Sequence, residues 1–419
     1  MKKYLFILAI ILAMQNANAG VFDGTQGDGT EGDPYRIYNI TDLKEVADSM
    51  PNIYNKYIDL HFKLMADITT PVDFSIRRFG PGYSTYNHVF DGNGYKITLF
   101  NNLGVFNTIE NGSVINLSVD GEVFGSNIDA GGIASTSNNG TIENCNNYAT
   151  ITGNYAVGGI VGRNNGRVVN CFNFAKIVCQ ATYAGGIAGM NTNYIGYCAN
   201  IGNVTNTGGY AGGITGKFSM GTTVNVEYCI NVGSIVSSNL AAGGIVGWNN
   251  IDMPTIVANC INYGLVSGNT FSAGIIGIRS KPVYTDVPPV VNCINTGVIL
   301  EGRNGTSAIL CNAQSAFSEL INCYYDKQMC IYGAASQYGS TSVGVDIPGQ
   351  ATGRLTRNMV GRKLASLLGD TDWTYVEGAT LIESLYPQLK VFSESNDERR
   401  TDASKVGATP IFLYDGIDD

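Results

Sequence analysis

The chain has 419 residues, a formal net charge of −9 and a charged fraction of 14%, against roughly 25% in average globular proteins. In place of charge it has 53 glycines and 24 tyrosines, a composition that suits tight turns and an uncharged polar surface. The length allows one elongated repeat domain or two to three compact ones. The chain lacks a Lys/Arg cluster that could form a basic face, which argues against a nucleic-acid partner.

The first 19 residues resemble a secretory signal peptide. Lys2 and Lys3 precede an apolar run over residues 4–14, and Ala17-Asn18-Ala19 is a small-x-small cleavage site. The run is shorter than the roughly 20 residues of a membrane-spanning helix, and no later segment is long and apolar enough to span a bilayer. We expect cleavage before Gly20, a mature net charge of −11 without the two lysines, and export to the cell surface or medium, with the periplasm as the alternative.

Residues 20–100 are predicted to form an N-terminal cap and the first coil of the fold. Thr41 is the expected N-cap and Met50-Pro51 the expected end of a helix with one apolar face, formed by Leu43, Val46, Ala47 and Met50. A strand is expected over residues 62–68. Residues 90–97 have a strand, turn and strand pattern that we expect to begin the first coil.

Residues 101–330 contain two recurring motifs. The first motif, Gly-Ile-x-Gly, begins at Gly159, Gly186, Gly213, Gly244 and Gly274, with intervals of 27, 27, 31 and 30 residues, and a degenerate copy begins at Gly132. The second motif is Asn-Cys-x-Asn or Tyr-Cys-x-Asn, and its last copy has Tyr325 in place of the final Asn. Its cysteines are Cys145, Cys171, Cys198, Cys229, Cys260, Cys293 and Cys323. A third apolar run follows each cysteine motif, as in Gly233-Ser234-Ile235-Val236.

Three strand-sized runs per period, separated by Gly/Asn turns, predict one coil of a right-handed, three-sided parallel β-helix. Inward Ile and Val would stack coil on coil about 4.8 Å apart. We expect the glycine pairs to allow positive φ and close backbone approach at corners, and the Asn two residues after Cys to form an amide ladder along a turn.

The seven motif cysteines are predicted to be structural. The preceding repeat has Leu117 in the same slot, so the slot is apolar and points inward. Buried free thiols are therefore favoured over inter-coil disulfides, whose torsion geometry would be poor, and over a metal site, which would need converging ligands. The pairing of Cys179, Cys311 and Cys330, which lie off the column, stays open.

Residues 331–392 are predicted to form a C-terminal cap. A helix is expected over residues 355–368, ended by Gly369, and large apolar groups follow at Trp373, Tyr375, Tyr386 and Leu389. Residues 393–419 are charged and poor in apolar side chains, which predicts a linker or flexible tail.

The Gly-Ile-x-Gly copies resemble the GLUG motif of bacterial surface proteins, which include adhesins and some secreted peptidases. The segment over residues 27–35 resembles the opening of such proteins, and Phe90-Asp91-Gly92-Asn93-Gly94 resembles a first-coil motif of the pectin-lyase-like β-helix group. The resemblance covers residues 25–392 and implies surface location and adhesion. It supplies no catalytic residues, and this chain has Ile where Leu is usual.

A polysaccharide lyase or glycoside hydrolase is the alternative function. Such an enzyme needs clustered acids, but Glu143 and Glu227 are expected about 14 Å apart, at three coils of ~4.8 Å each. Asp252 and Asp286 lie in longer insertions where a local site could form. The two histidines, His61 and His88, do not form H-E-x-x-H, and we expect no catalytic residues, metal or cofactor.

The favoured function is a non-catalytic scaffold for adhesion or ligand binding, with a host or matrix protein or a glycan as partner. Irregular loops on a rigid scaffold commonly carry recognition, and the insertion over residues 280–289 breaks the repeat period. Tyrosines that could stack on sugars or peptides are Tyr54, Tyr57, Tyr83, Tyr86, Tyr183, Tyr194, Tyr210 and Tyr284.

Overall fold

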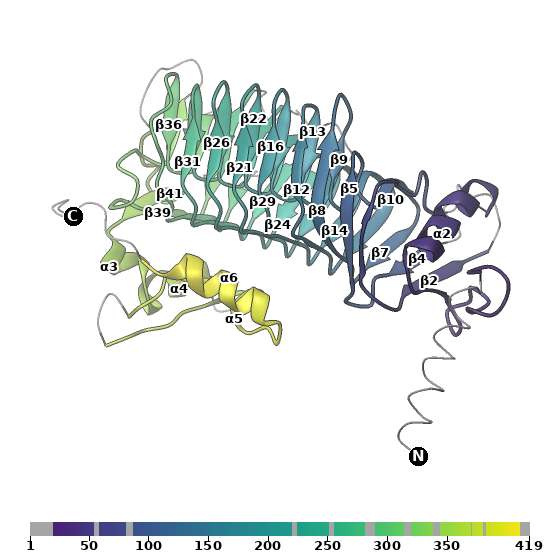
Figure 1. The fold of residues 1–419 in the computed structure, drawn as a ribbon. Helices are drawn as coiled ribbons and strands as arrows, with labels where there is room; N and C mark the ends of the chain where they lie inside the picture. Colours follow the sequence, from purple (N-terminus) through teal and green to yellow (C-terminus); the bar gives the residue numbers. More distant parts are fainter. Residues whose placement is uncertain are drawn as a thin grey trace.

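A computed structural model describes residues 20–53, 58–80, 87–219, 224–250, 255–280, 290–313, 320–337, 344–369, 371–379 and 383–410. The predicted signal peptide, residues 1–19, lies outside this part of the chain. The described residues form a parallel β-solenoid of about ten turns, with a helix at its N-terminal end and a helical segment along its side (Figure 1). The predicted parallel β-helix is therefore confirmed.

Three parallel sheets form the faces of the solenoid. Within the described residues they have 18, 16 and 7 strands, and we call them sheets A, B and C. One coil contains β18 (Ala188–Asn191) and β19 (Tyr194–Gly196) in sheet A, β20 (Ala199–Asn200) and β21 (Val204–Asn206) in sheet B, and β22 (Tyr210–Gly212) in sheet C. This coil has five short strands instead of the expected three because the backbone breaks once on each of two faces.

Equivalent residues of successive coils stack in register and fill the interior. Ile187 donates its backbone N–H to Ile214 and accepts from Ile160, both at 3.0 Å. The isoleucine column is fully buried and consists of Ile133, Ile160, Ile187, Ile214, Ile245 and Ile275. Because each coil buries its apolar side chains against the next coil, the core is continuous along the solenoid axis.

The turn from sheet A into sheet B lies at the residue before each motif cysteine. Its φ is between 50° and 58° at Asn144, Asn170, Tyr197, Tyr228, Asn259, Asn292 and Asn322. We expected positive φ and a close backbone approach at the glycine pairs. The close approach is confirmed, but the positive φ is wrong, since no glycine of the five Gly-Ile-x-Gly copies has it. Asn is frequent before Cys because it tolerates the left-handed region better than most residues.

The predicted amide ladder lies two residues after each motif cysteine except Cys323 and is fully buried. Each Asn donates Nδ2 to Oδ1 of the Asn one coil further on, at 2.7–2.8 Å, through Asn147, Asn173, Asn200, Asn231, Asn262 and Asn295. The same Nδ2 also donates to the backbone carbonyl two residues later, as Asn200 does to Gly202 at 2.8 Å. The column satisfies buried polar atoms without charge and holds the coils in register.

The solenoid begins earlier than predicted. Strand β1 (Tyr35–Ile37) pairs in parallel with β2 (Leu60–Leu64), which pairs with β4 (His88–Asp91). The turn after β4 leads into β5 (Lys96–Asn101), as expected, but it does not start the first coil. The strand expected over residues 62–68 is divided between β2 and β3 (Ile68–Val72).

The N-terminal helix α2 (Ile40–Ile53) packs its buried face against the first coils. Its N-cap is Asn39 rather than the predicted Thr41, since Asn39 Oδ1 accepts from the backbone N–H groups of Thr41 and Asp42 at 2.8 and 3.1 Å. The helix also continues past the predicted end at Pro51, and the further turn buries Ile53.

The stack also continues beyond residue 330, where we expected it to end. Strand β41 (Ala351–Arg354) pairs in parallel with β39 (Cys323–Asp326). The helix expected over residues 355–368 is divided into α3 (Thr356–Met359) and α4 (Arg362–Leu368), because Gly361 between them has a φ of 62°.

Residues after α4 pack along the side of the solenoid rather than over its end (Figure 1). They contain β42 (Trp373–Thr374), β43 (Gln388–Leu389), α5 (Lys390–Ser393) and α6 (Glu398–Ala408). The prediction of a linker or flexible tail is wrong for residues 393–410, and residues 411–419 lie outside the described part. The charged helix α6 is held by a few buried residues, Ala403, Ser404 and Ala408, too few to mark it in the sequence.

Candidate functional site

One outward column of sheet B determines where the C-terminal segment, from α4 to α6, can pack. In order along the solenoid, the aligned residues are Lys96, Ser118, Asn146, Phe172, Ala199, Ile230, Ile261 and Ile294. The apolar part, from Phe172 onward, is buried under Leu364, Trp373, Leu389 and Phe392. The first three positions are polar, and the start of α6 lies beside Ser118 and Asn146.

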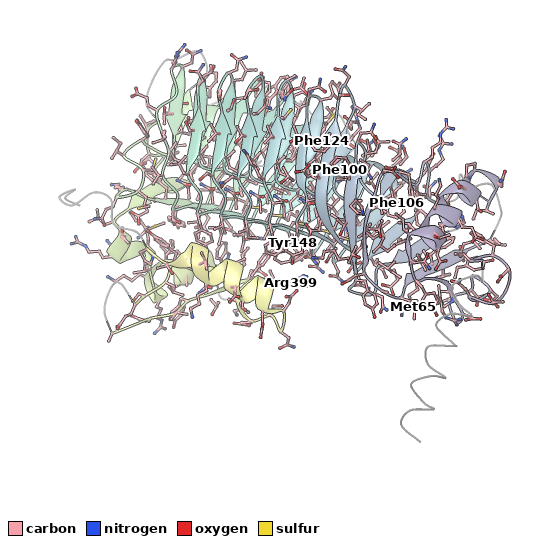
Figure 2. The ribbon with its side chains drawn as sticks, viewed as in Figure 1. Met65, Phe100, Phe106, Phe124, Tyr148 and Arg399 are labelled. Carbon is pink, nitrogen blue, oxygen red and sulfur yellow. The ribbon has the colours of Figure 1, made fainter. Side chains whose placement is uncertain are left out.

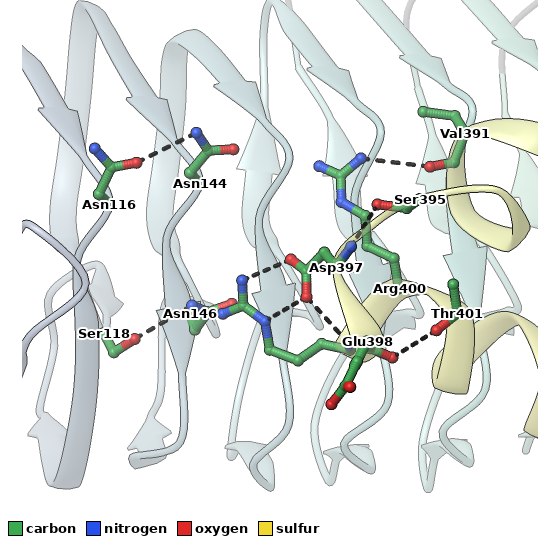
Figure 3. Close-up of polar contacts among 11 residues, drawn as sticks. Asn116, Ser118, Asn144, Asn146, Val391, Ser395, Asp397, Glu398, Arg400 and Thr401 are labelled. Carbon is green, nitrogen blue, oxygen red and sulfur yellow. Dashed lines mark hydrogen bonds and ion pairs between the residues drawn. The ribbon is translucent and has the colours of Figure 1, made fainter.

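A cavity of about 530 Å³ lies between the start of α6 and these polar positions (Figure 3). We call it the α6 groove; its lining residues are Gly94, Asn116, Ser118, Asn144, Asn146, Asn170, Ser395, Asn396, Asp397, Arg399 and Arg400. Its volume is in the range of small-molecule sites. The solenoid contributes amides and a hydroxyl, and α6 contributes two guanidinium groups and one carboxylate.

Asn146, in β11 (Asn146–Asn147), is the most buried polar residue on the solenoid side of the groove, at 4% exposure. Its Nδ2 donates to Ser118 Oγ at 3.2 Å, whereas its buried Oδ1 has no hydrogen-bond partner among the described residues. The neighbouring corner column presents further amides, with Asn144 Nδ2 donating to Asn116 Oδ1 at 3.3 Å.

On the other side of the groove, Asp397 caps α6 and accepts from the backbone N–H of Arg399 at 3.1 Å. The Arg399 side chain binds the same carboxylate through two nitrogens, at 2.9 and 2.6 Å, and these bonds hold the pKa of Asp397 below its usual value. Arg400 lies against the rings of both Phe172 and Phe392, at 5.7 and 5.9 Å from their centroids, and burial lowers its pKa.

The edge of the groove has an aromatic residue, Tyr148, which is 39% exposed and close to Arg399 (Figure 2). Its ring stacks on Phe174, with centroids 4.8 Å apart and planes 6° from parallel. Lys96 lies 5.9 Å from the other side of the Tyr148 ring and pairs with Asp120 at 3.1 Å. The groove thus combines amides and cations, and an aromatic ring lies beside it.

A second feature lies on the opposite corner of the coils, where sheet C meets sheet A. Here the rings of Tyr155, Tyr183, Tyr210 and Trp248 form what we call the aromatic row. Tyr183 stacks on Tyr210 at 6.2 Å, and Tyr210 stacks on Trp248 at 4.4 Å. Outward residues of two sheets meet because the second glycine of each Gly-Ile-x-Gly lies against sheet C: a Cβ on Gly189 would be 2.3 Å from Val157 N.

Two cations border the aromatic row. Lys217 lies 4.8 Å from the Tyr183 ring centroid and 4.7 Å from that of Trp248, and it donates to Tyr183 Oη at 3.3 Å. Arg163 lies 5.8 Å from the Tyr155 ring and pairs with Asp129 at 2.8 Å. Burial against these groups lowers the pKa of Lys217 and raises the pKa of Tyr183 and Tyr210.

The structure places all seven motif cysteines in the core, with 0% exposure and no disulfide. Each thiol donates to the carbonyl two residues before it at 3.2–3.3 Å, as Cys198 does to Gly196. Burial raises the pKa of Cys171, Cys229 and Cys260 well above the ordinary value. The three cysteines off the column, Cys179, Cys311 and Cys330, are also buried and unpaired.

Of the tyrosines proposed from the sequence, Tyr183 and Tyr210 belong to the aromatic row. Tyr194 lies elsewhere on sheet A, 4.3 Å from the Arg167 guanidinium. Five others lie outside the described residues, namely Tyr54, Tyr57, Tyr83, Tyr86 and Tyr284. Residues 281–289 of the predicted recognition loop also lie outside them.

The acids considered for hydrolysis remain apart. The register passes from Glu143 through Val169 and Gly196 to Glu227, which places the two carboxylates three coils apart, as predicted. Asp252 and Asp286 lie outside the described part of the chain. Among the residues that the structure describes, no group of three or more His, Cys, Asp or Glu is placed to hold a metal ion.

Arg399 and Arg400 were missed by sequence reasoning because they lie in the supposed tail. The run Ser395-Asn396-Asp397-Glu398 is a capping signal that could have located the start of α6. Nothing in the sequence shows that α6 lies beside coils more than 200 residues earlier.

No family model and no curated protein matches the chain. One similar solved structure is a Bacteroides ovatus protein described as a putative immunoglobulin A1 protease; the two share 18% identity over 87% of this chain and 94% of that chain, with a TM-score of 0.45. The resemblance to GLUG proteins stays a prediction. Within the described ranges, no helix is long and apolar enough to cross a membrane. The register and sheets establish the chain as a parallel β-solenoid.

Proposed function

We propose that the chain is an exported, non-catalytic scaffold of the cell surface or medium that adheres to a host or matrix partner through the aromatic row. The observation that carries this proposal is the outward stack of Tyr183, Tyr210 and Trp248, with Lys217 against two of the rings. Tyr, Trp and Arg dominate the energetics of protein interfaces, because they combine large apolar area with polar tips.

The scaffold around the row supports this role. Stacked rings on successive coils form a rigid surface that loses little conformational entropy on binding, since their neighbours already hold the side chains in place. The separation of Glu143 and Glu227 by three coils leaves that pair too far apart for a glycosidase mechanism. We therefore favour binding over the alternative of a polysaccharide lyase or glycoside hydrolase.

The test compares the wild-type chain with Trp248→Ala and Tyr210→Ala for binding to host cells, purified matrix proteins and a glycan array. We expect at least about a tenfold loss of affinity in each row variant, the size of effect that truncating an interface anchor has. Tyr194→Ala is the matched control, because Tyr194 lies on sheet A outside the row. Equal binding by all four proteins would contradict the role of the row.

Catalysis is tested separately on acidic and neutral polysaccharides. A scaffold releases neither unsaturated nor new reducing ends from them. Reproducible release of either product by the purified wild-type chain would overturn the proposal of a non-catalytic protein and favour the lyase or hydrolase.

A further inference from the structure

The α6 groove holds a buried acceptor that the protein itself does not use. Asn146 Oδ1 has no partner among the described residues, although the side chain is 4% exposed and lines the cavity. An unsatisfied buried acceptor destabilises the folded protein, because it has lost its hydrogen bonds to water. A ligand that donates a hydrogen bond at this point would compensate for that loss, and a hydroxyl group is such a donor.

The groove also holds a cation with unused donors. Arg399 is bound by Asp397 through two nitrogens. Within the described residues, the guanidinium of Arg400 makes one long hydrogen bond, 3.5 Å to the carbonyl of Val391 (Figure 3). The rings of Phe172 and Phe392 border the same guanidinium. A guanidinium has five N–H donors in a plane, and a carboxylate matches two of them.

The groove is closed in one direction. Beyond Asn146, the outward column is covered from Phe172 to Ile294 by the C-terminal segment, so an elongated ligand cannot run through along the coils. In the other direction lie the uncovered Ser118 and Lys96 positions. This geometry favours the end of a chain over an internal stretch of a polymer.

We propose that the α6 groove binds the terminal acidic sugar of a glycan, with a sugar hydroxyl donating to Asn146 Oδ1 and the carboxylate accepting from Arg400. Further hydroxyls meet the amides of Asn144 and Asn170. A neutral sugar would leave the Arg400 donors unmatched, and a simple carboxylate would leave Asn146 Oδ1 without a donor. An acidic sugar supplies both groups. This site is independent of the aromatic row, which lies on the other corner of the coils.

The experiment measures binding of glucuronate and N-acetylneuraminate to the full chain by calorimetry, beside glucose, acetate and a tetraglutamate peptide. We expect saturable binding of at least one acidic sugar, with glucose, acetate and the peptide at least tenfold weaker. Asn146→Leu should weaken acidic-sugar binding at least tenfold, the equivalent of about 1.4 kcal/mol. The same variant should keep or raise the unfolding temperature, because it removes an unsatisfied acceptor.

Two further variants, one test and one control, make the binding experiment independent of the folding of Asn146→Leu. Arg400→Lys keeps the charge but loses the planar donors, so it should also weaken acidic-sugar binding, even if Asn146→Leu fails to fold. Asn239→Leu is the control, since Asn239 is exposed and does not line the α6 groove. Equal binding of glucose, of acetate or of the peptide, or no binding of either acidic sugar, would overturn the proposal. Trp248→Ala should leave this binding unchanged, which separates it from the adhesion proposal.

Discussion

Gly186 and Asn200 belong to different motifs but form one contact inside the same coil. A Cβ on Gly186 would lie 2.3 Å from Asn200 Cγ and 2.2 Å from the Gly213 carbonyl oxygen. The equivalent glycines at 159, 213, 244 and 274 face Asn173, Asn231, Asn262 and Asn295 in the same way. Gly-Ile-x-Gly and Asn-Cys-x-Asn therefore recur together because the first glycine leaves the space that the buried amide ladder occupies.

Gly186→Ala should destabilise the solenoid by about 3 kcal/mol, the upper end of the usual range for overpacking, since the new methyl group meets a backbone carbonyl and a hydrogen-bonded amide that cannot move apart. The free energy of unfolding in denaturant measures the effect. Gly32→Ala is the control, because a Cβ there meets no atom within 4 Å. Similar stability of the two variants would show that this close approach does not restrict the sequence.

All ten cysteines should be reduced and unreactive in the folded protein. Their side chains are buried and unpaired, and burial raises the pKa of Cys311 to about 11 and that of Cys330 to about 12, which disfavours the reactive thiolate. A thiol reagent should therefore label few groups in native protein and ten after denaturation. Recovery of few free thiols in denaturant, restored by a reductant, would instead reveal disulfides between coils.

His88 should make the fold less stable as the pH falls from about 6.5 to 4. The side chain is fully buried, neither ring nitrogen has a partner in the described part of the chain, and desolvation lowers its pKa from 6.5 to about 4. Asp59 opposes this shift and His61 adds to it. Stability is complete above the unfolded pKa and decreases as the unfolded chain takes up the proton, by up to about 3 kcal/mol.

The measurement for His88 is the unfolding free energy across this pH range in wild type, His88→Phe and His61→Gln. The phenylalanine variant should lose most of the pH dependence between 6.5 and 4, whereas His61→Gln should retain it. A parallel decline in wild type and His88→Phe would assign the effect to other groups.

Phe392→Asp should release the C-terminal segment from the solenoid. Phe392 is fully buried and contacts Phe172 edge to face, with ring centroids 6.2 Å apart. Loss of such a side chain costs about 3–5 kcal/mol. Trypsin should then cleave at Arg399 and Arg400 much faster than in wild type. Val406→Asp, at a position 69% exposed, should leave cleavage slow. Rapid cleavage of the wild type would contradict this prediction, because it would show that residues 393–410 form a flexible tail.

Much of the coil could be predicted because stacked coils repeat one environment many times. The Cys slot was identified as inward from Leu117 alone, and the amide ladder from the spacing of Asn after Cys. The role of glycine was predicted in part: the glycines are required by close approach, as expected, but positive φ lies at the residue before Cys instead. A sequence shows which residues recur but not which backbone atoms they face.

By itself, the sequence determined the parallel β-solenoid, the seven-cysteine column and the Asn ladder, since these depend on a local period that every coil repeats. Only the tertiary structure decided where the C-terminal segment lies, and with it the α6 groove. Asn146 and Arg400 are 254 positions apart in the numbering of the chain, and their proximity follows from an apolar column that begins at Phe172 and has to be covered. No local pattern encodes such a contact, because it depends on the outer faces of several coils together.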